Sequence, residues 1–250
     1  MQQSWKTLAL VLALTPGVAR LSAAVPRPTP AVPDRPPDKL SDIYRIFTQA
    51  TRQAFGAPDL QCSHIRMLGR SRERLRAALF PEVELTVKPF DAQGLRFEKV
   101  DLLFRHLTVD PKALQAWQLK MQDVREVQSR LVFTLRSLAQ KLSAAAGQEI
   151  KLRADLDAQQ LLLSGQGHFL FVPCTVEARC QPVWNEAARS LRLTPLQQSF
   201  GGHRIPAWLW WLGRSPVPQT PVLDLGPSWI PYNIQEVHVG WDRINLSTNW

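Results

Sequence analysis

Apolar residues recur at helical spacing between residues 38 and 55 and predict an amphipathic helix. The residues on its apolar face are Leu40, Ile43, Tyr44, Phe47, Ala50, Ala54 and Phe55. Asp38 lies where an N-cap is expected, and Gly56 with Pro58 marks the end of the helix. Because the polar face is not strongly basic, we expect the helix to cover a sheet rather than to lie in a membrane surface.

After residue 80 the apolar spacing changes to two, which predicts strands. Val83, Leu85 and Val87 alternate with polar residues, as in a half-buried strand. The turn at residues 91–94 leads into a second apolar series, formed by Leu95, Phe97, Val100, Leu102 and Phe104. In that series the apolar positions change from odd to even numbers after Phe97. We expect a β-bulge there, because one extra residue changes which side chains face the core.

Later segments show similar alternation and extend the predicted sheet. Their apolar residues are Ile150, Leu152, Ala154 and Leu156; Leu161, Leu163, Phe169 and Phe171; Leu191 and Leu193; and Ile234, Val237, Val239, Ile244 and Leu246. Thr134 is expected to cap a second helix that ends at Gly147, and a short helical turn is expected after Asp110 and Pro111. The apolar face of the second helix contains Leu135, Leu138, Ala139 and Leu142.

Together these elements predict an α+β fold. A long, strongly twisted antiparallel sheet, arranged as a meander, curls around the N-terminal amphipathic helix, and a second helix is inserted mid-chain. Helix and strands match in length, because eighteen helical residues span about 27 Å and an eight-residue strand spans about the same distance.

A sheet curled around a helix of this length would enclose an elongated apolar trough. Half of the hydrocarbon thickness of a bilayer is about 15 Å, so such a trough would accept acyl chains. The side chains expected to line it are Ile43, Phe47, Val83, Leu85, Val87, Leu152 and Ala154. The alternative is that side chains fill the same space as an ordinary core.

The first 24 residues have the order of features found in a secretory signal peptide. Lys6 precedes the short apolar run at residues 8–14, and Ser22-Ala23-Ala24 provides a small-residue cleavage site. A retained membrane anchor is the alternative, although the apolar run is much shorter than the roughly 20 residues of a membrane-spanning helix. Residues 25–37 are rich in proline and predict an extended linker. The folded part is therefore expected to be a single domain at residues 38–250, on the extracytoplasmic side of a bacterial envelope, soluble or peripherally associated with the membrane.

Charge and composition narrow the expected partners. The chain has 30 Lys and Arg against 21 Asp and Glu, for a net charge of +9, which favours anionic partners. It also has nine Trp against two Tyr, and Trp is enriched at membrane interfaces and apolar ligand surfaces. Basic residues are dispersed rather than concentrated along one element, and an exported protein rarely meets nucleic acid, so we do not expect nucleic acid as a partner.

No pattern for catalysis, cofactor binding or metal binding stands out. The chain lacks the common nucleophile, phosphate-loop, zinc-protease and dinucleotide motifs, and its five His residues are scattered singly. Glu82 and Glu84 share one face of a predicted strand, where two Glu side chains are usually just solvated. Cys174 and Cys180 would form a disulfide only if a hairpin turn lay between them, because an extended strand would hold them about 20 Å apart. We expect no catalytic residues, no metal and no cofactor.

The segment from His203 to Arg214 is the most unusual part of the sequence. Its central residues are Trp208, Leu209, Trp210, Trp211 and Leu212, which are apolar on every face. Arg204 and Arg214 flank them, as expected for a segment that enters a membrane interface while its ends meet phosphates. We therefore interpret these seven residues as a lipid or membrane contact, and a buried crossover beneath the end of the sheet is the alternative.

The order of these elements resembles a bacterial envelope family. The resemblance lies in the signal segment, the leading helix, the hairpin strands at residues 83–87 and 94–102, the helix capped by Thr134, and the late segment at residues 230–239. In this order they are similar to the LmeA-type phospholipid-binding domain, over roughly residues 60–247. The resemblance implies export and phospholipid binding, and it provides no catalytic residues.

Two functions are consistent with these observations. The first is a non-catalytic extracytoplasmic protein that binds or shuttles phospholipid or another anionic amphiphile in an apolar trough and contacts a membrane surface. The alternative is an envelope assembly or scaffold factor with a filled core and a basic docking surface. An enclosed apolar cavity at least as long as half a bilayer would distinguish the first from the second.

Overall fold

The computed structural model describes most of the chain from residue 37 onward. The described residues are 37, 39–69, 73–74, 77–169, 172–208, 217, 220–226 and 228–248. The predicted signal peptide (1–24) and all but the last residue of the predicted linker (25–37) lie outside them. The structure therefore leaves both interpretations as predictions.

The predicted N-terminal helix is confirmed as α1 (Leu40–Phe55), with one correction at its start. Lys39, rather than Asp38, occupies the N-cap, and its backbone N–H donates a hydrogen bond to the Asp42 carboxylate over 3.3 Å. An acidic side chain inside the first turn thus pairs with an N-terminal N–H group that has no partner within the helix. The helix ends at Gly56, whose φ of 62° is the left-handed conformation that glycine adopts at low cost.

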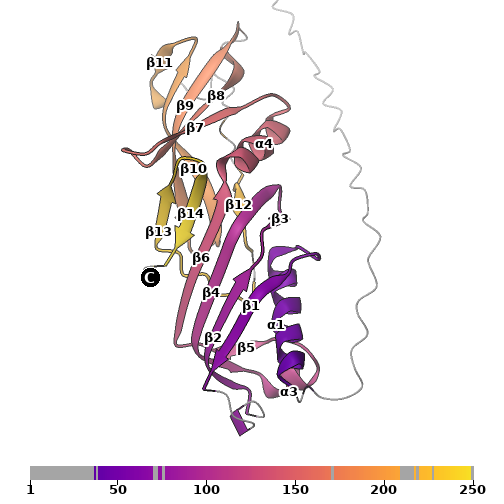
Figure 1. Cartoon of the computed structure of the whole chain (residues 1–250). Helices are drawn as coiled ribbons and strands as arrows, with labels where there is room; N and C mark the ends of the chain where they lie inside the picture. The colour runs from indigo at the N-terminus through magenta and orange to yellow at the C-terminus, as the bar shows by residue number, and fades with distance from the viewer. Residues whose placement is uncertain are drawn as a thin grey trace, which may run out of the picture. The chain divides into compact units, whose positions relative to one another are not determined.

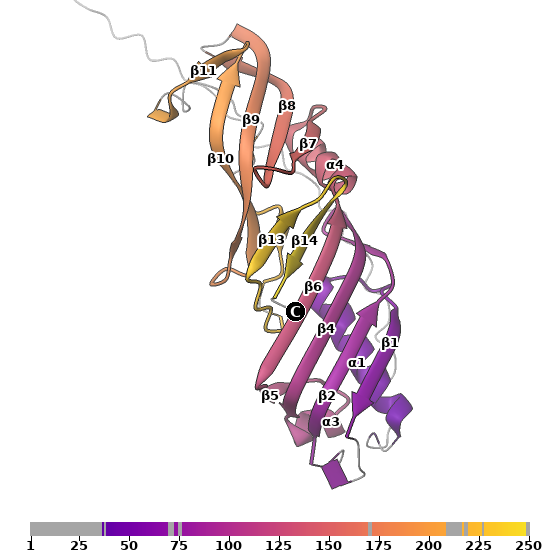
Figure 2. The same ribbon diagram turned by 60° about the vertical axis from the view of Figure 1, so that its left-hand side comes forward.

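Strands that follow α1 in the sequence form a first antiparallel sheet. Its eight strands among the described residues are β1 (Cys62–Leu68), β2 (Leu79–Val87), β3 (Phe90–Ala92), β4 (Leu95–Val109), β5 (Met121–Asp123), β6 (Glu126–Thr134), β13 (Glu236–Val239) and β14 (Arg243–Ser247). The main order is β1-β2-β4-β6-β14-β13, and β3 and β5 pair with β4. Figures 1 and 2 show α1 along one face of this sheet.

The bulge predicted in the second apolar series is confirmed. Pairing of β4 with β6 shifts register between Phe97 and Lys99, so that the buried side chains change from odd to even positions there. The parity changes back before Leu107, at His106, whose φ of 54° is in the left-handed region. Two local irregularities therefore keep one face of a fifteen-residue strand directed at the core.

Aromatic side chains fill the layer between α1 and the first sheet. Phe47 packs edge-on against Phe80 of β2, with ring centroids 5.7 Å apart. Phe55 packs in the same way against Phe90 and Phe97, at 5.2 and 5.7 Å. Edge-to-face ring pairs at these distances contribute about 0.5–1.5 kcal/mol each beyond the burial of their area. These contacts attach the helix to the sheet at its middle and at its C-terminal end.

The strands form two sheets among the described residues rather than the single meander expected. The second sheet contains β7 (Lys151–Asp155), β8 (Gln160–Phe169), β9 (Val172–Asn185), β10 (Ser190–Phe200), β11 (His203–Ile205) and β12 (Leu223–Asp224). Its main order is β11-β10-β9-β8-β7, and β12 pairs with β10. The expectation failed because β14 pairs with β6, so strands that follow β6 in the sequence build a separate ladder.

Both later helices are confirmed where the sequence predicted them. In α4 (Leu135–Ala146), Thr134 Oγ1 accepts a hydrogen bond from the Ser137 N–H over 3.2 Å, and Gly147 ends the helix with a φ of 66°. In α3 (Pro111–Gln115), the Asp110 carboxylate accepts from the Lys112 N–H over 2.9 Å. Helix α4 leads from the first sheet to the second, as Figure 1 shows.

Buried residues from both sheets belong to one hydrophobic cluster. Lys141 of α4 donates from Nζ to the carbonyl of Val222 over 2.8 Å, and Gln93 accepts from the N–H of Asp224 over 3.0 Å. Tyr232, in the segment that returns to the first sheet, is completely buried. The second sheet is therefore joined to the first by packing and hydrogen bonds as well as by the chain.

Candidate functional site

Polar side chains on one face of the second sheet form two adjacent rows. Directly paired residues in antiparallel strands project to the same face. Register places Lys151, Ser164, Glu177, Ser199 and Arg204 opposite one another across β7, β8, β9, β10 and β11. This first row brings Arg204, one of the predicted membrane contacts, onto the same face as residues from four other strands.

The second row lies two residues farther along β7 and β9. It contains Arg153, Leu162, Arg179 and Gln197, paired across β7, β8, β9 and β10. Residues two apart in a strand share a face, so both rows belong to the same surface. Together the rows carry four basic side chains and one acidic side chain, which makes this face a basic surface.

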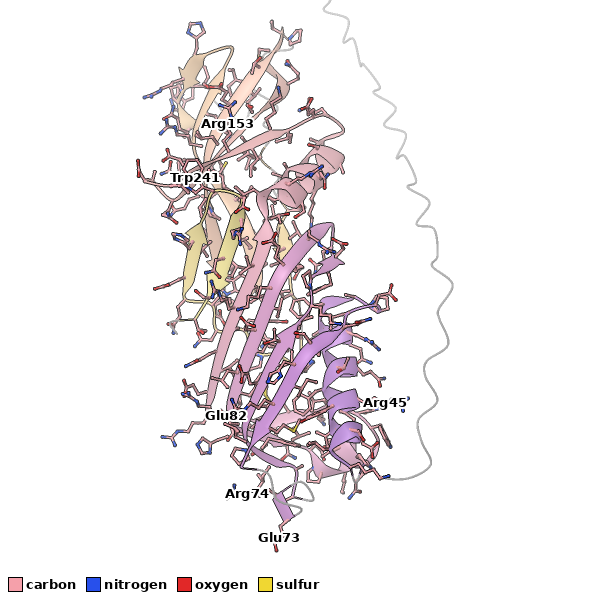
Figure 3. The ribbon with its side chains drawn as sticks, viewed as in Figure 1. Arg45, Glu73, Arg74, Glu82, Arg153 and Trp241 are labelled. Carbon is pink, nitrogen blue, oxygen red and sulfur yellow. The ribbon has the colours of Figure 1, made fainter. Side chains whose placement is uncertain are left out.

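A pocket of about 320 Å³ is hollowed into this basic face. Its lining residues are Arg153, Leu162, Leu163, Ser164, Glu177, Ala178, Arg179, Gln197 and Ser199. The only ion pair found for Arg179 among the described residues is a long one, 4.0 Å from Nη1 to Asp155 Oδ2. Arg153, labelled in Figure 3, has no ion-pair partner within the described part of the chain. The volume is near the lower end of the range for ligand pockets, about 300–1,000 Å³.

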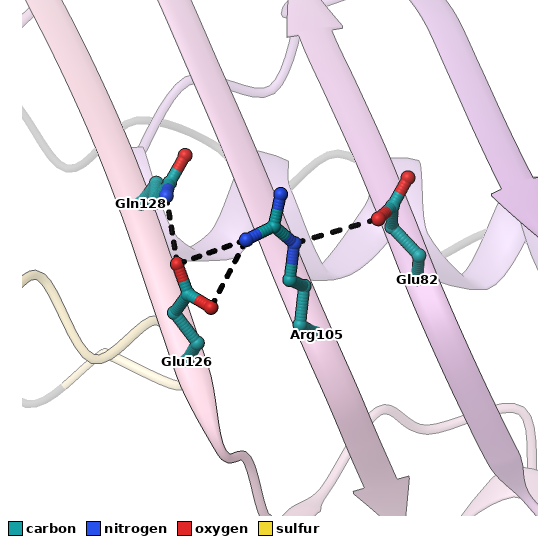
Figure 4. A network of polar contacts seen from close by, with 4 residues as sticks. All are labelled: Glu82, Arg105, Glu126 and Gln128. Atoms are coloured by element: carbon teal, nitrogen blue, oxygen red, sulfur yellow. Dashed lines mark hydrogen bonds and ion pairs between the residues drawn. The ribbon is translucent and has the colours of Figure 1, made fainter. Parts of the chain in front are cut away.

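On the outer face of the first sheet, one arginine joins three strands. Arg105 of β4 donates from Nη1 to both carboxylate oxygens of Glu126 on β6, each over 3.1 Å, and its Nε lies 3.5 Å from Glu82 on β2 (Figure 4). Gln128 adds a hydrogen bond of 2.7 Å to Glu126. The hydrogen bond from Arg105 holds the pKa of Glu126 below its usual range.

This network gives Glu82 a structural role. Glu82 lies opposite Arg105 in the strand register, whereas Glu84 lies opposite Leu103 and Arg66. The two carboxylates therefore have different neighbours, and Glu82 belongs to the ion-pair network of Arg105. We assign Glu82, Arg105 and Glu126 to cross-strand stabilisation of the sheet.

Two tryptophans project into solvent. Trp208, from the predicted lipid contact, is 72% exposed, and Trp241, in the turn between β13 and β14, is 82% exposed and labelled in Figure 3. Arg204 is also exposed, on β11. The other members of the predicted contact, Leu209, Trp210, Trp211, Leu212 and Arg214, lie outside the described residues. For Trp208 itself, the structure does not show the burial that a crossover beneath the sheet would require.

Most of the predicted trough-lining residues are core residues. Ile43, Phe47, Val83, Leu85 and Val87 are at most 2% exposed. Leu152 and Ala154 are half-buried and pack against the same cluster. At Phe47 the space beneath the helix is occupied by Phe80 and by Trp229, whose ring centroid lies 6.0 Å away. There, side chains fill the space as the alternative interpretation expected.

The sequence neither predicted nor excluded a disulfide between Cys174 and Cys180, and the structure does not contain one. Cys174 and Cys180 lie on the same continuous strand, β9, without a turn between them, and both are free, as is Cys62. Burial raises the pKa of the Cys180 thiol to about 12. Within the described residues, no group of three or more His, Cys, Asp and Glu side chains is placed to hold a metal ion.

The residues around the pocket were not identified from the sequence. Glu177 and Arg179 belong to β9, which the sequence analysis did not predict, although Thr175, Glu177, Arg179 and Gln181 alternate with apolar residues. That alternation was the available signal for a two-faced strand. Arg153 was on a predicted strand, but its partners across the sheet were unknown.

Comparison with known proteins adds no relative. No protein-family model matches the chain, and searches of curated proteins and of solved structures find no match either. The resemblance to the LmeA-type phospholipid-binding domain therefore stays a prediction. None of the helices in the described part of the chain combines the length and the apolar character needed to cross a membrane.

Proposed function

We propose that this is a non-catalytic, extracytoplasmic protein that binds phospholipid at a membrane surface. The observation that carries the proposal is the 72% exposure of Trp208, directly before four further apolar residues in the sequence. A large exposed aromatic side chain in such a setting favours contact with an apolar partner. Trp is also well suited to the membrane interface, because its ring is apolar and its N–H can remain hydrated.

Basic residues near this segment support an anionic or phosphate-bearing surface as the partner. Three residues, 205–207, separate Arg204 from the apolar run Trp208–Leu212. Arg204 faces the same side of the second sheet as Lys151. Each basic residue close to an anionic membrane contributes about 1 kcal/mol to binding. Apolar insertion and phosphate contact would therefore act together at this end of the second sheet.

We propose that the lipid binds at the surface rather than beneath α1. Phe80 and Trp229 pack directly on Phe47, so an acyl chain would have to displace them from that part of the predicted trough. Displacing buried aromatic rings costs several kcal/mol. A peripheral mode of binding requires no such rearrangement.

Vesicle binding tests this proposal. Wild-type protein is expected to sediment with vesicles that contain phosphatidylglycerol, and a variant with Trp208, Trp210 and Trp211 replaced by Ser should lose this binding while keeping a nearly unchanged melting temperature. Trp241→Ser is the matched control, since it removes another strongly exposed Trp, from the turn between β13 and β14. Absence of binding by the wild type, or unfolding of the triple variant, would contradict an interfacial role for this segment.

A second candidate function is favoured by the packed core. If the basic face docks onto an envelope complex or an anionic polymer, the protein would act as a scaffold whose interior binds nothing. Native mass spectrometry of gently purified protein distinguishes the two functions. Copurified phospholipid supports the phospholipid-binding function, whereas a lipid-free protein that also does not bind vesicles supports the scaffold function.

A further inference from the structure

The pocket on the second sheet contains both signs of charge, and their arrangement is specific. Arg153 and Arg179 lie in one row on either side of Leu162, about 10 Å apart at the backbone because two strand spacings separate them. Both residues line the pocket, and Arg179 Nη1 lies 4.0 Å from Asp155 Oδ2, which is not among the lining residues. Two guanidinium groups around one small space favour an oxyanion with several acceptor oxygens, of which phosphate is the common biological example.

Glu177 adds an acidic group at a defined distance from this pair. It lies two residues before Arg179 on the same strand, about 7 Å away along the backbone, and it also lines the pocket. Within the described residues Glu177 has no ion-pair partner. A carboxylate beside a phosphate site would repel a ligand carrying only negative charge, whereas it would attract a ligand with a cationic group next to its phosphate.

Neutral donors and acceptors complete the lining. Ser164 and Ser199 lie directly opposite Glu177 on the neighbouring strands, and Gln197 lies opposite Arg179. Their side chains provide hydrogen bonds without adding charge. The pocket volume of about 320 Å³ fits a polar headgroup better than a whole lipid with acyl chains.

We propose that this pocket binds a phosphoethanolamine group, with the phosphate between Arg153 and Arg179 and the ammonium donating hydrogen bonds to Glu177. The proposal rests on the proposed function in one respect, because it takes a membrane phospholipid as the source of the group. The ammonium of ethanolamine has N–H donors that Glu177 accepts, and a quaternary choline has none. The site therefore distinguishes two zwitterionic headgroups that carry the same net charge.

Soluble headgroups test the site independently of membrane binding. Titration of the full chain with glycerophosphoethanolamine, monitored by calorimetry, is expected to show saturable binding at least about tenfold tighter than glycerophosphocholine or inorganic phosphate. Arg153→Gln or Arg179→Gln should weaken the binding of glycerophosphoethanolamine at least about tenfold. Glu177→Leu, which removes both the charge and the hydrogen-bond acceptor, should abolish the preference for ethanolamine over choline. Binding of glycerophosphocholine should weaken less than binding of glycerophosphoethanolamine, because it loses only the attraction between its quaternary ammonium and the carboxylate.

Arg192→Gln is the matched control. Arg192 is exposed on β10 opposite Val183 and does not line the pocket, so its replacement changes the charge of the sheet by the same amount without affecting binding. Melting temperatures of all four variants should match the wild type, since each replaced side chain is at least partly exposed to water. If Arg192→Gln weakened headgroup binding as much as Arg153→Gln or Arg179→Gln, the proposal would be overturned, because the effect would then come from net charge.

Vesicles containing phosphatidylethanolamine separate this inference from the proposed function. Binding of the soluble headgroup without binding to vesicles supports the pocket and contradicts the membrane function. The pocket is overturned, and the membrane function stands, if the protein binds vesicles but no soluble headgroup and if Arg153→Gln and Arg179→Gln leave the vesicle binding unchanged. Preference for inorganic phosphate over both glycerophosphodiesters would also overturn it, because it would identify a free-phosphate site.

Discussion

Burial of the Cys180 thiol within the second sheet changes its acid–base chemistry. The side chain is completely buried, and removal from water disfavours the thiolate, so the pKa rises from 9.0 to about 12. In the unfolded chain the thiol ionises near pH 9, whereas in the folded chain it remains protonated until about pH 12. The unfolded state therefore loses its proton first as the pH is raised.

This difference predicts an alkaline loss of stability. The contribution of Cys180 is fully present below pH 9 and declines as the pH rises towards 12, by about 1.4 kcal/mol for each pH unit in that window. Urea unfolding at pH 8 and pH 10 measures it. In Cys180→Ala the same pH change should cost about 1.4 kcal/mol less than in the wild type, and equal losses in both proteins would show that the thiol is not protected.

Single residues differ in how well the sequence could predict their roles. Thr134 and Gly147 were predictable because capping chemistry depends on local geometry, and both act as expected. Asp38 was the natural choice for an N-cap, yet Asp42 reaches back to the N–H of Lys39 instead. The role of Arg105 depends on Glu82 and Glu126, which are 23 and 21 residues away, and only the strand register brings them together.

At the scale of elements, helix α4 connects the two sheets and depends on its cap. Thr134 is the last residue of β6 and the N-cap of α4, so a strand ends and a helix begins at the same residue. Its hydroxyl accepts from the Ser137 N–H and also donates to Ser137 Oγ over 2.9 Å. Both bonds hold the chain in the direction that leads to the second sheet.

Replacing this cap should lower the stability of the protein measurably. Thr134→Ala is expected to lower the free energy of unfolding by about 1 kcal/mol, the usual cost of losing an N-cap side chain. Thermal or urea unfolding followed by circular dichroism provides the measurement. Thr194→Ala, at an exposed position of β10, is the control and should change stability by no more than about 0.5 kcal/mol. A loss as small as that of the control would mean that the hydrogen bond to Ser137 is replaced by water at little cost.

Elements with clear periodicity were predictable, and those with mixed patterns were missed. The residues of β1 do not alternate, because it is an edge strand with a register irregularity between Cys62 and His64. In β6 three consecutive residues, Leu131 to Phe133, are buried, which hides the period of two. The prolines Pro173 and Pro182 argued against a strand where β9 runs. Each miss reflects packing on both faces or local irregularity that a single sequence pattern does not express.

At the scale of the whole molecule, strand order could not be read from alternation. Strand β14 pairs with β6 although more than a hundred residues separate them, and the second sheet occupies that interval. Periodicity identifies which residues face a core, but it does not say which strand lies beside which. The basic face depends on the same information, since Lys151 and Arg204 come together only through the pairing of five strands.

Net charge and the exposed tryptophans make separable contributions to the proposed membrane binding. Removal of residues 1–24 would take away Lys6 and Arg20 and no acidic residue, so the net charge changes from +9 to +7. A positively charged protein is attracted to anionic vesicles over distances set by the Debye length, about 10 Å in 0.1 M salt and about 3 Å in 1 M salt. Insertion of apolar rings is not screened in this way.

Raising the salt concentration should therefore weaken binding without abolishing it. For the protein without residues 1–24, partition onto phosphatidylglycerol vesicles is expected to fall at least about tenfold between 0.1 and 1 M NaCl, because the loss of more than one contact of about 1 kcal/mol corresponds to that factor. The remaining partition should disappear when Trp208, Trp210 and Trp211 are all replaced by Ser, whereas Trp241→Ser should retain it. Sedimentation with vesicles at both salt concentrations provides the measurement. Complete loss of wild-type binding at high salt would mean that charge alone attaches the protein, and the apolar segment would then need another partner.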